Sequence, residues 1–303
     1  MAKLDVIAGF LGAGKTTFIS HYIAWLTTQN IKYAVIENEF GVAGIDAETL
    51  REKGAKVKEI SGGCICCTMQ VSLHSLLSEL SQEVDRIILE PSGLFNGDDF
   101  IGILQNPTLK SSLRKGMWLG VVDPLALPLF SEPEVEVLAD ELIFAGSVLI
   151  SKTRLADETR IAAAVRSIEN MVPAPKPLIF TADWESYTPD IWFPQLQHSG
   201  FQTRPHERKA INHRLLYESA RLLPSGEFSE DRLRAVAEDI MRSDAGEILR
   251  IKGFVSSKSG GTFALNCTPG NVSIQQSEGR FKPVLNIIGR DLDRGKIKKM
   301  FQP

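Results

Sequence analysis

The stretch Gly-Phe-Leu-Gly-Ala-Gly-Lys-Thr at 9–16 constrains this chain of 303 residues more than any other. It matches the P-loop pattern G-x-x-x-x-G-K-[ST], whose backbone amides cradle a polyphosphate. The apolar run at 4–8 before it predicts a buried strand. The stretch 16–29 after it carries apolar side chains on one face and predicts a helix. This strand–loop–helix order predicts a nucleotide-binding site.

The residues of this loop have separate predicted tasks. Its glycines let the backbone turn its N–H groups inward, and the N-terminus of the following helix adds positive potential. We expect Lys15 to reach the β- and γ-phosphates and the Thr16 hydroxyl to ligate Mg²⁺. The nucleotide-binding residues predicted here are Gly9, Gly12, Ala13, Gly14, Lys15, Thr16 and Thr17.

Composition narrows the class of protein. Hydrophobic residues make up 43% and charged residues 23% of the chain, which is typical of a globular protein. The formal net charge of −3 gives no support for a nucleic-acid partner or an anionic membrane surface. No apolar stretch approaches the length of a membrane span, and the first predicted strand begins almost at Met1, which leaves no room for a signal peptide. We therefore expect a cytoplasmic protein.

The first 180 residues alternate short apolar runs with helical segments, which predicts an α/β fold of the P-loop NTPase type with a doubly wound, mostly parallel sheet. Strands are expected at 4–8, 33–36, 57–60, 86–90, 117–122, 147–150 and 177–180, and further helices at 70–81, 133–144 and 155–171. In such sheets ligands bind at the carboxyl ends of the strands.

The domain organisation follows from a change in pattern after this region. We expect a nucleotide-binding domain at 1–182, an irregular connector at 183–212 and a smaller α+β domain at 213–303. In the last of these, the sequence predicts helices at 229–242 and 291–301 and strands at 248–255, 262–267, 271–276 and 284–288.

Two groups of carboxylates follow predicted strands. Glu90 ends the strand 86–90 and is the expected acidic partner of the Mg²⁺ shell; Gly93 follows it and could bring an N–H to the γ-phosphate. Glu37 and Glu39 follow the strand 33–36 at the same edge. They are candidate metal ligands or water positioners. The alternative for Glu90 is a surface carboxylate at a strand end.

Asp46 lies on the loop that follows, where Gly41 and Gly44 allow a segment that orders around a γ-phosphate and Mg²⁺. The alternative for this segment is a solvated acidic turn. The predicted catalytic residues are Lys15, Thr16, Glu39, Asp46 and Glu90.

Three of the four cysteines, Cys64, Cys66 and Cys67, fall within four positions. A disulfide framework would spread its cysteines, so this clustering indicates metal binding or thiol chemistry. Soft thiolates select Zn²⁺ or Cu(I), and Glu37 or His74 could be the fourth ligand. The alternative is a set of buried, inert cysteines.

Taken in order, the motifs GFLGAGKTT at 9–17, ENEFG at 37–41, GID at 44–46, GGCICC at 62–67 and EPSG at 90–93 resemble the CobW-like branch of the P-loop GTPases, which is related to HypB and UreG. The resemblance extends to LRIKGF at 249–254 and IGRDLD at 288–293. It implies a GTPase that uses GTP/GDP and Mg²⁺ and carries Zn²⁺, Co²⁺ or Ni²⁺ as a metallochaperone or metal insertase.

This chain departs from the family pattern in two places. The guanine-reading motif N-K-x-D is replaced by Ser-Lys-Thr-Arg at 151–154, so Lys152 is kept for the purine face but Arg154 stands where the aspartate accepts hydrogen bonds. GTP remains the expected nucleotide, with relaxed purine specificity or ATP use as the alternative; Asp157 is a weaker substitute for the lost acceptor. The His-rich tract of many relatives is reduced to His198, His206 and His213.

Two functions therefore stay open at this point. The first is a slow GTPase that hands a transition metal to a client metalloprotein or a cobalamin-dependent enzyme. The second is a non-catalytic, nucleotide-regulated binding module with a structural metal. The sequence leaves a homodimer open and names neither the metal nor the client. Cys267, alone in the C-terminal part, is expected in the core.

Overall fold

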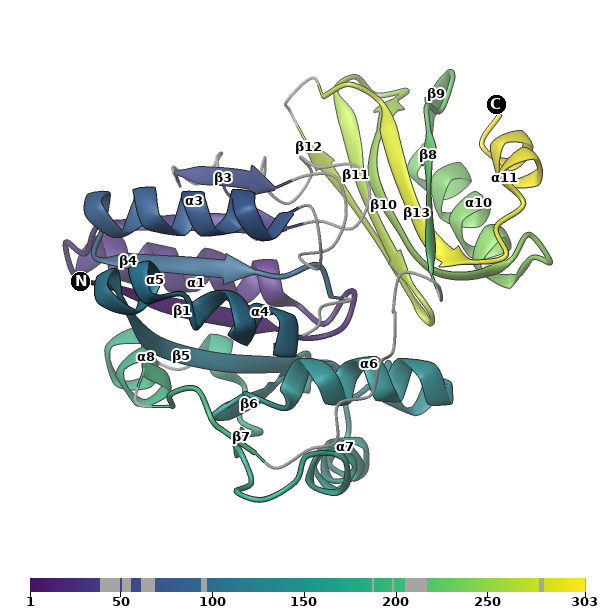
Figure 1. The fold of residues 1–303 in the computed structure, drawn as a ribbon. Helices are drawn as coiled ribbons and strands as arrows, with labels where there is room; N and C mark the ends of the chain where they lie inside the picture. The colour runs from purple at the N-terminus through teal and green to yellow at the C-terminus, as the bar shows by residue number, and fades with distance from the viewer. Residues whose placement is uncertain are drawn as a thin grey trace. The chain divides into compact units, whose positions relative to one another are not determined.

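The computed structural model describes residues 1–38, 50, 56–60, 69–93, 97–186, 188–197, 199–204, 217–277 and 281–302. The chain divides into two compact units, one holding the described residues up to 204 and the other those from 217 onward. Each unit has its own sheet and its own hydrophobic core (Figure 1). The predicted Glu39, Asp46, Cys64, Cys66 and Cys67, and the histidines at 198, 206 and 213, lie outside the described residues.

The first unit is built on a sheet of seven parallel strands in the order β3-β2-β4-β1-β5-β6-β7. The strands are β1 (Ala2–Ala8), β2 (Tyr33–Asn38), β3 (Val57–Ile60), β4 (Arg86–Glu90), β5 (Leu113–Val122), β6 (Ser147–Ile150) and β7 (Leu178–Phe180). β4 and β6 are buried along their whole length, as expected for parallel strands covered on both faces. The predicted α/β class is confirmed.

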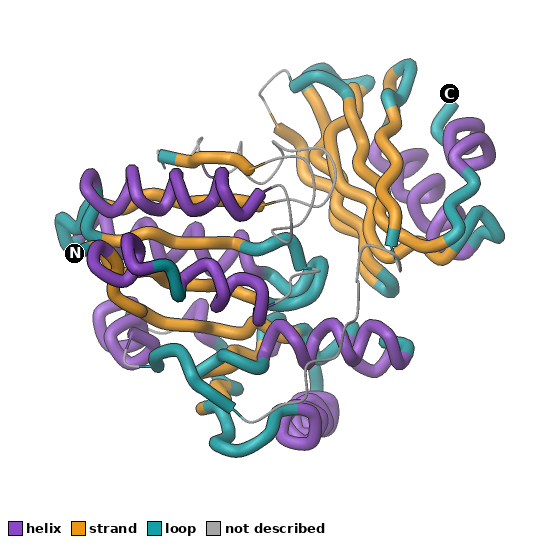
Figure 2. The backbone as a smooth tube through the Cα atoms, viewed as in Figure 1, coloured by secondary structure: helices purple, strands orange, loops and turns teal. Residues whose placement is uncertain are grey.

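Helices cover both faces of this sheet (Figure 2). They are α1 (Lys15–Thr28), α3 (Met69–Glu83), α4 (Gly97–Leu104), α5 (Pro107–Ser112), α6 (Glu132–Leu142), α7 (Glu158–Met171) and α8 (Pro189–Gln197). α1 packs with α8, and α3 packs with α5. Among these, α4 and α5 were not expected from the sequence, because they are short and lie within a single loop between two strands.

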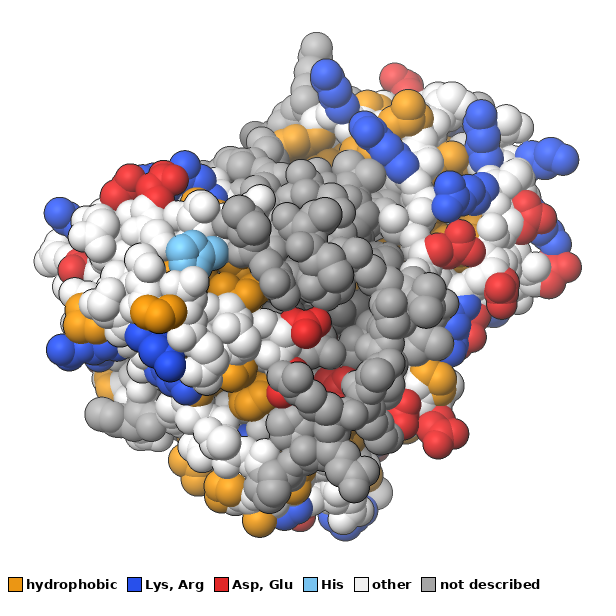
Figure 3. Space-filling model, in the orientation of Figure 1, with side chains coloured by type: hydrophobic (Ala, Val, Ile, Leu, Met, Phe, Trp, Pro, Cys, Tyr) orange, Lys and Arg blue, Asp and Glu red, His pale blue; other side chains and the backbone are white. Residues whose placement is uncertain are grey.

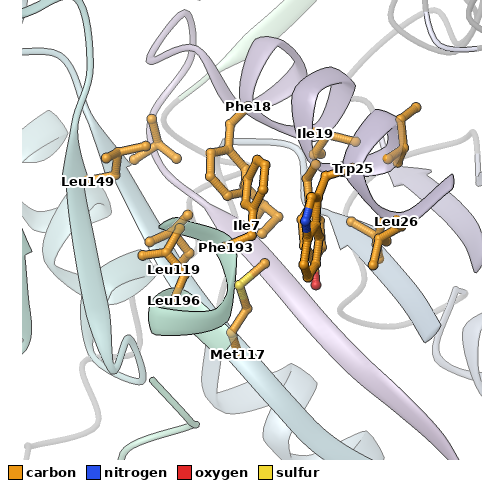
Figure 4. Close-up of a cluster of buried hydrophobic side chains, with 14 of the residues drawn as sticks. Ile7, Phe18, Ile19, Trp25, Leu26, Met117, Leu119, Leu149, Phe193 and Leu196 are labelled. Atoms are coloured by element: carbon orange, nitrogen blue, oxygen red, sulfur yellow. The ribbon is translucent and has the colours of Figure 1, made fainter. Parts of the chain in front are cut away.

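The core between α1, α8 and the sheet is rich in aromatic side chains (Figure 4). Phe18 of α1 lies 5.7 Å from Phe193 of α8 and 5.6 Å from Trp184 between ring centroids. The expectation of an irregular connector at 183–212 is therefore wrong over 184–197, where a 3-10 turn (Trp184–Ser186) and α8 bury Trp184, Trp192 and Phe193. The prolines and glycines of this segment predicted an irregular loop, but the helix α8 accommodates Pro194 in its interior.

A buried polar network centred on Asp5, the middle residue of β1, ties the same elements together. Arg86 of β4 donates to the Asp5 carboxylate at 2.6 Å and to the Tyr22 hydroxyl at 2.7 Å. Tyr22 donates to Asp5 at 3.0 Å and accepts from Gln197 of α8 at 3.2 Å. The backbone N–H of Met117 satisfies the second Asp5 oxygen at 2.9 Å. A buried charge pair supported by this many hydrogen bonds is tolerated inside a core.

The second unit is an antiparallel sheet with helices against one face (Figure 2). Its strands are β8 (Glu218–Leu222), β9 (Glu227–Phe228), β10 (Glu247–Ser257), β11 (Thr262–Thr268), β12 (Asn271–Ser277) and β13 (Val284–Arg290), and its helices are α10 (Glu230–Arg242) and α11 (Arg294–Met300). The antiparallel order is β12-β11-β10-β13-β8, and the short β9 pairs with β10 in parallel. β8 and β9 were not predicted; the other elements fall where the sequence placed them.

The described surface carries charges of both signs. On the face seen in Figure 3, Lys and Arg side chains are interspersed with Asp and Glu over the second unit. The terminal basic helix follows this rule, since Lys296 pairs with Asp244 and Arg294 with Glu218. None of the described helices is long and apolar enough to cross a bilayer.

Candidate functional site

The predicted site residues gather at one edge of the parallel sheet. The P-loop follows β1, Glu37 lies in β2 and Glu90 ends β4. On the other side of β1, Asp123 follows β5 and Lys152 follows β6. Because all seven strands are parallel, the carboxyl ends of these strands share one edge, where ligands of such sheets bind.

The P-loop has the backbone that its glycines were predicted to allow. Gly9, Gly12 and Gly14 have φ of 140°, 76° and 103°, a region that favours glycine. A Cβ on Gly9 would lie 2.2 Å from the carbonyl oxygen of Val121 in β5. The loop is therefore pressed against the neighbouring strand, and any side chain at position 9 would displace it.

Lys15, the first residue of α1, is 5% exposed and folds back over the loop. Its ammonium donates to the carbonyl oxygens of Gly9 at 2.7 Å and Phe10 at 3.3 Å. A Cβ on Gly93, whose φ is 70°, would lie 3.1 Å from the same nitrogen and 3.0 Å from the Leu11 amide nitrogen. Gly93 thus lies directly against the P-loop.

Thr16 and Glu90 lie side by side, as a shared Mg²⁺ shell requires. The Thr16 hydroxyl is 3.0 Å and 3.2 Å from the two oxygens of the Glu90 carboxylate. Glu90 is 5% exposed, so the alternative of a surface carboxylate does not hold. A hydroxyl and a carboxylate are the hard oxygen donors that Mg²⁺ takes from proteins, and these two residues fit that ion.

Only Glu37 and His74 of the predicted transition-metal ligands lie within the described residues. Glu37 is buried and lies in register with Glu90 across β2 and β4. The buried Nε2 of His74 in α3 has no hydrogen-bond partner among the described residues. Within the part of the chain that the structure describes, no three His, Cys, Asp or Glu side chains form a metal cluster. The cysteine loop falls outside that part, and the predicted ligand set stays a prediction.

The residues that follow β6 depart from the expected base-reading arrangement. Lys152 has a left-handed backbone with φ of 51°, and its ammonium lies 2.5 Å from the Asp123 carboxylate. Arg154 donates through Nε to Asp183, which follows β7, at 2.6 Å. Asp157 instead caps α7 by accepting from the Arg160 amide at 2.8 Å, so it does not replace the lost aspartate.

Glu141 of α6 is a site residue that the sequence did not reveal. It is fully buried, and its Oε2 accepts a hydrogen bond from the Gly9 amide at 2.5 Å. Its backbone carbonyl accepts from the Trp118 indole at 3.2 Å. The two partners lie 132 residues apart in the chain, and Glu141 is one of several acidic residues of its helix, so no local signal distinguished it.

Cys267 is confirmed as a core residue of the second unit. It is fully buried in β11 and takes part in no disulfide. Burial raises the pKa of its thiol to about 12, so it stays protonated at neutral pH and is a poor ligand and nucleophile.

Two family models match the chain, one over each of its two units. A family model described as CobW/HypB/UreG, nucleotide-binding domain, matches residues 3–180, and one described as the cobalamin synthesis protein cobW C-terminal domain matches residues 217–303.

Several curated relatives are similar over part or most of the chain. The zinc chaperone YeiR of Escherichia coli is 37% identical over 157 residues, which is 50% of this chain and 47% of that protein. The zinc chaperone CobW of Pseudomonas aeruginosa is 28% identical over 297 residues, covering 84% and 78%. The zinc-regulated GTPase metalloprotein activator 1 of Dictyostelium discoideum is 26% identical over 208 residues, covering 56% and 42%. The chain thus spans about half the length of the first of these relatives.

Proposed function

Because the chain belongs to the CobW/HypB/UreG family and carries the cobW C-terminal domain, we propose that it is a Mg²⁺-dependent GTPase that binds a transition metal and delivers it to a client protein. The observation that supports hydrolysis is the contact of Thr16 with Glu90 beside the P-loop lysine. The names of the relatives, zinc chaperones and a zinc-regulated GTPase, support Zn²⁺ as the cargo.

Each described residue has a task in the proposed reaction. When bound, Mg²⁺ would be held by Thr16 and Glu90 and would neutralise charge on the β- and γ-phosphates. Lys15 exchanges its two loop carbonyls for phosphate oxygens, and the P-loop amides hold the phosphate chain. Gly93 brings its backbone against the same pocket. We assign the positioning of the attacking water to Glu39 or Asp46.

For the cargo metal we propose Cys64, Cys66 and Cys67 with Glu37 or His74. Three thiolates and one further donor make the tetrahedral set that Zn²⁺ prefers. Glu37 supports a link to the nucleotide, because its backbone pairs in register with that of Glu90. If metal and nucleotide are coupled, each changes the affinity of the other by the same factor.

The experiment that tests this function measures three quantities on the purified chain. GTP hydrolysis with Mg²⁺ is compared with that of Lys15→Ala, which should lose it. Zn²⁺ affinity is measured by chelator competition with GTP or GDP bound, and we expect different values. Equal affinities would rule out nucleotide-controlled delivery. In Cys66→Ser, a large loss of folding free energy would favour the structural-metal module, whereas an intact fold without metal-dependent hydrolysis supports transfer.

A further inference from the structure

The direction in which a nucleotide lies across the sheet edge follows from the positions of the described residues. Thr16 and Glu90, which hold the phosphate end, place that end on the β4 side of β1. The nucleoside must then lead toward the opposite side, over β5, β6 and β7. On that side Ser151 lies against the P-loop, since a Cβ on Gly14 would be 3.7 Å from the Ser151 Cβ. The segment 151–154 is therefore next along the path.

Two ion pairs are found on this path. Lys152 is held by Asp123, so its aliphatic stem is fixed across the ends of β5 and β6. Arg154, which follows β6, pairs with Asp183 at 2.6 Å and lies 3.9 Å from Glu185. Both acidic residues follow β7, so these contacts link the ends of β6 and β7. The side chain of Arg154 is 58% exposed and that of Asp183 is 30% exposed, so a ligand can reach both.

The Arg154–Asp183 pair combines hydrogen-bond donors and acceptors, whereas a lone aspartate offers acceptors only. Arginine offers only donors and an ionised carboxylate only acceptors. Between these two residues Nε donates to Oδ2, and the guanidinium carries further N–H donors and the carboxylate a second acceptor oxygen. The pair therefore presents one donor and one acceptor next to each other.

Both purines match such a pair. The Watson–Crick edge of guanine has the acceptor O6 beside the donor N1–H, and that of adenine has a donor amino group beside the acceptor N1. A carboxylate alone accepts from guanine N1–H and its amino group but repels adenine N1, whereas a donor–acceptor pair satisfies either base. The order of the two groups is reversed between the bases, so reading both requires the exposed side chain of Arg154 to turn and present either order.

We propose that the Arg154–Asp183 ion pair reads the purine edge and makes this chain a dual-specificity purine nucleotide binder, with GTP and ATP bound within about tenfold of one another. The inference rests on the nucleotide site proposed above and specifies the class of its ligand. A second carboxylate at position 154 would accept a charged hydrogen bond from guanine and repel N1 of adenine. Restoring that carboxylate should therefore change the ratio of GTP to ATP affinity measurably.

The test is a calorimetric titration of the full chain with GTP and with ATP, each with Mg²⁺. Arg154→Asp turns the pair into two acceptors and should raise the preference for GTP over ATP at least tenfold. Arg154→Ala removes the donor and should weaken both nucleotides about three- to tenfold. Arg160→Ala is the matched control, because Arg160 is 54% exposed and also pairs with an aspartate, Asp157, at 3.8 Å; it should change neither affinity.

Two outcomes would overturn the inference. One is a wild-type preference for GTP over ATP above about tenfold; the other is a ratio that Arg154→Asp leaves unchanged. Either result would leave the proposed GTPase intact. If the wild-type chain bound neither nucleotide, the proposed function would fall as well, and this result is distinct from the other two.

Discussion

Replacement of Glu141 by alanine tests whether a buried carboxylate holds the P-loop in place. Glu141 accepts from the Gly9 amide at 2.5 Å and is fully buried. A hydrogen bond to a charged group contributes about 1.5–3 kcal/mol, and a buried donor left without a partner costs about 1–3 kcal/mol. We therefore expect Glu141→Ala to lower the free energy of unfolding by about 2–3 kcal/mol.

The effect should also reach the nucleotide. Gly9 starts the turn that directs the loop amides inward, so loosening it should weaken GTP binding about tenfold, which corresponds to about 1.4 kcal/mol. Glu141→Gln keeps an acceptor oxygen and should lose less, about 1 kcal/mol of stability. Urea denaturation gives the unfolding free energy, and calorimetry gives the affinity.

The control is Glu132→Ala, which removes an exposed carboxylate from the first turn of the same helix. Its unfolding free energy should stay within about 1 kcal/mol of wild type. The reasoning would be refuted if Glu141→Ala unfolded like the control and bound GTP with the wild-type affinity.

Three further predictions concern other residues. Gly93→Ala places a Cβ 3.0 Å from the P-loop backbone at a φ of 70°, so GTP affinity measured by calorimetry should fall at least tenfold; an unchanged affinity would contradict the contact. Arg86→Ala leaves the buried Asp5 carboxylate without its cation, and urea denaturation should show a loss of about 3–5 kcal/mol; a loss below 1 kcal/mol would mean that water or a proton compensates. Lys296 lowers the pKa of Asp244 from 3.8, so the pair stabilises the fold above that pH and loses its contribution as the pH falls through the lower folded value. An NMR titration of Lys296→Gln should move the Asp244 midpoint back up, and no movement would rule out the pair.

The predicted residues that the structure places together at the sheet edge share a local signal. The P-loop was found because its eight residues are contiguous, and Glu90 because an acidic residue at the end of an apolar strand must lie at the ligand edge of a parallel sheet. The pairing of β1 with β4 then brings Glu90 to Thr16. These inferences need only the order of the predicted strands and the pattern of apolar residues that marks each strand.

The residues that the sequence missed depend on contacts between distant parts of the chain. Glu141 meets Gly9 across 132 positions, and Asp183 meets Arg154 from a different strand end. α8 was hidden for the same reason: its apolar side chains have no clear period of their own and are explained only by the aromatic face of α1 that they cover. Local secondary-structure propensity does not predict a contact with a residue that the tertiary fold brings from a distant part of the chain.

The hydrogen bond from Gln197 to Tyr22 closes a loop of 175 positions and sets an order on biosynthesis. While the ribosome is still making residues before α8, the aromatic side of α1 has no cover, and the Asp5–Arg86–Tyr22 network lacks its last donor. The nucleotide-binding unit can therefore reach its final packing only after Gln197 has been translated. Until then a nascent chain exposes the aggregation-prone aromatic face of α1, the kind of apolar surface that ribosome-associated chaperones shield.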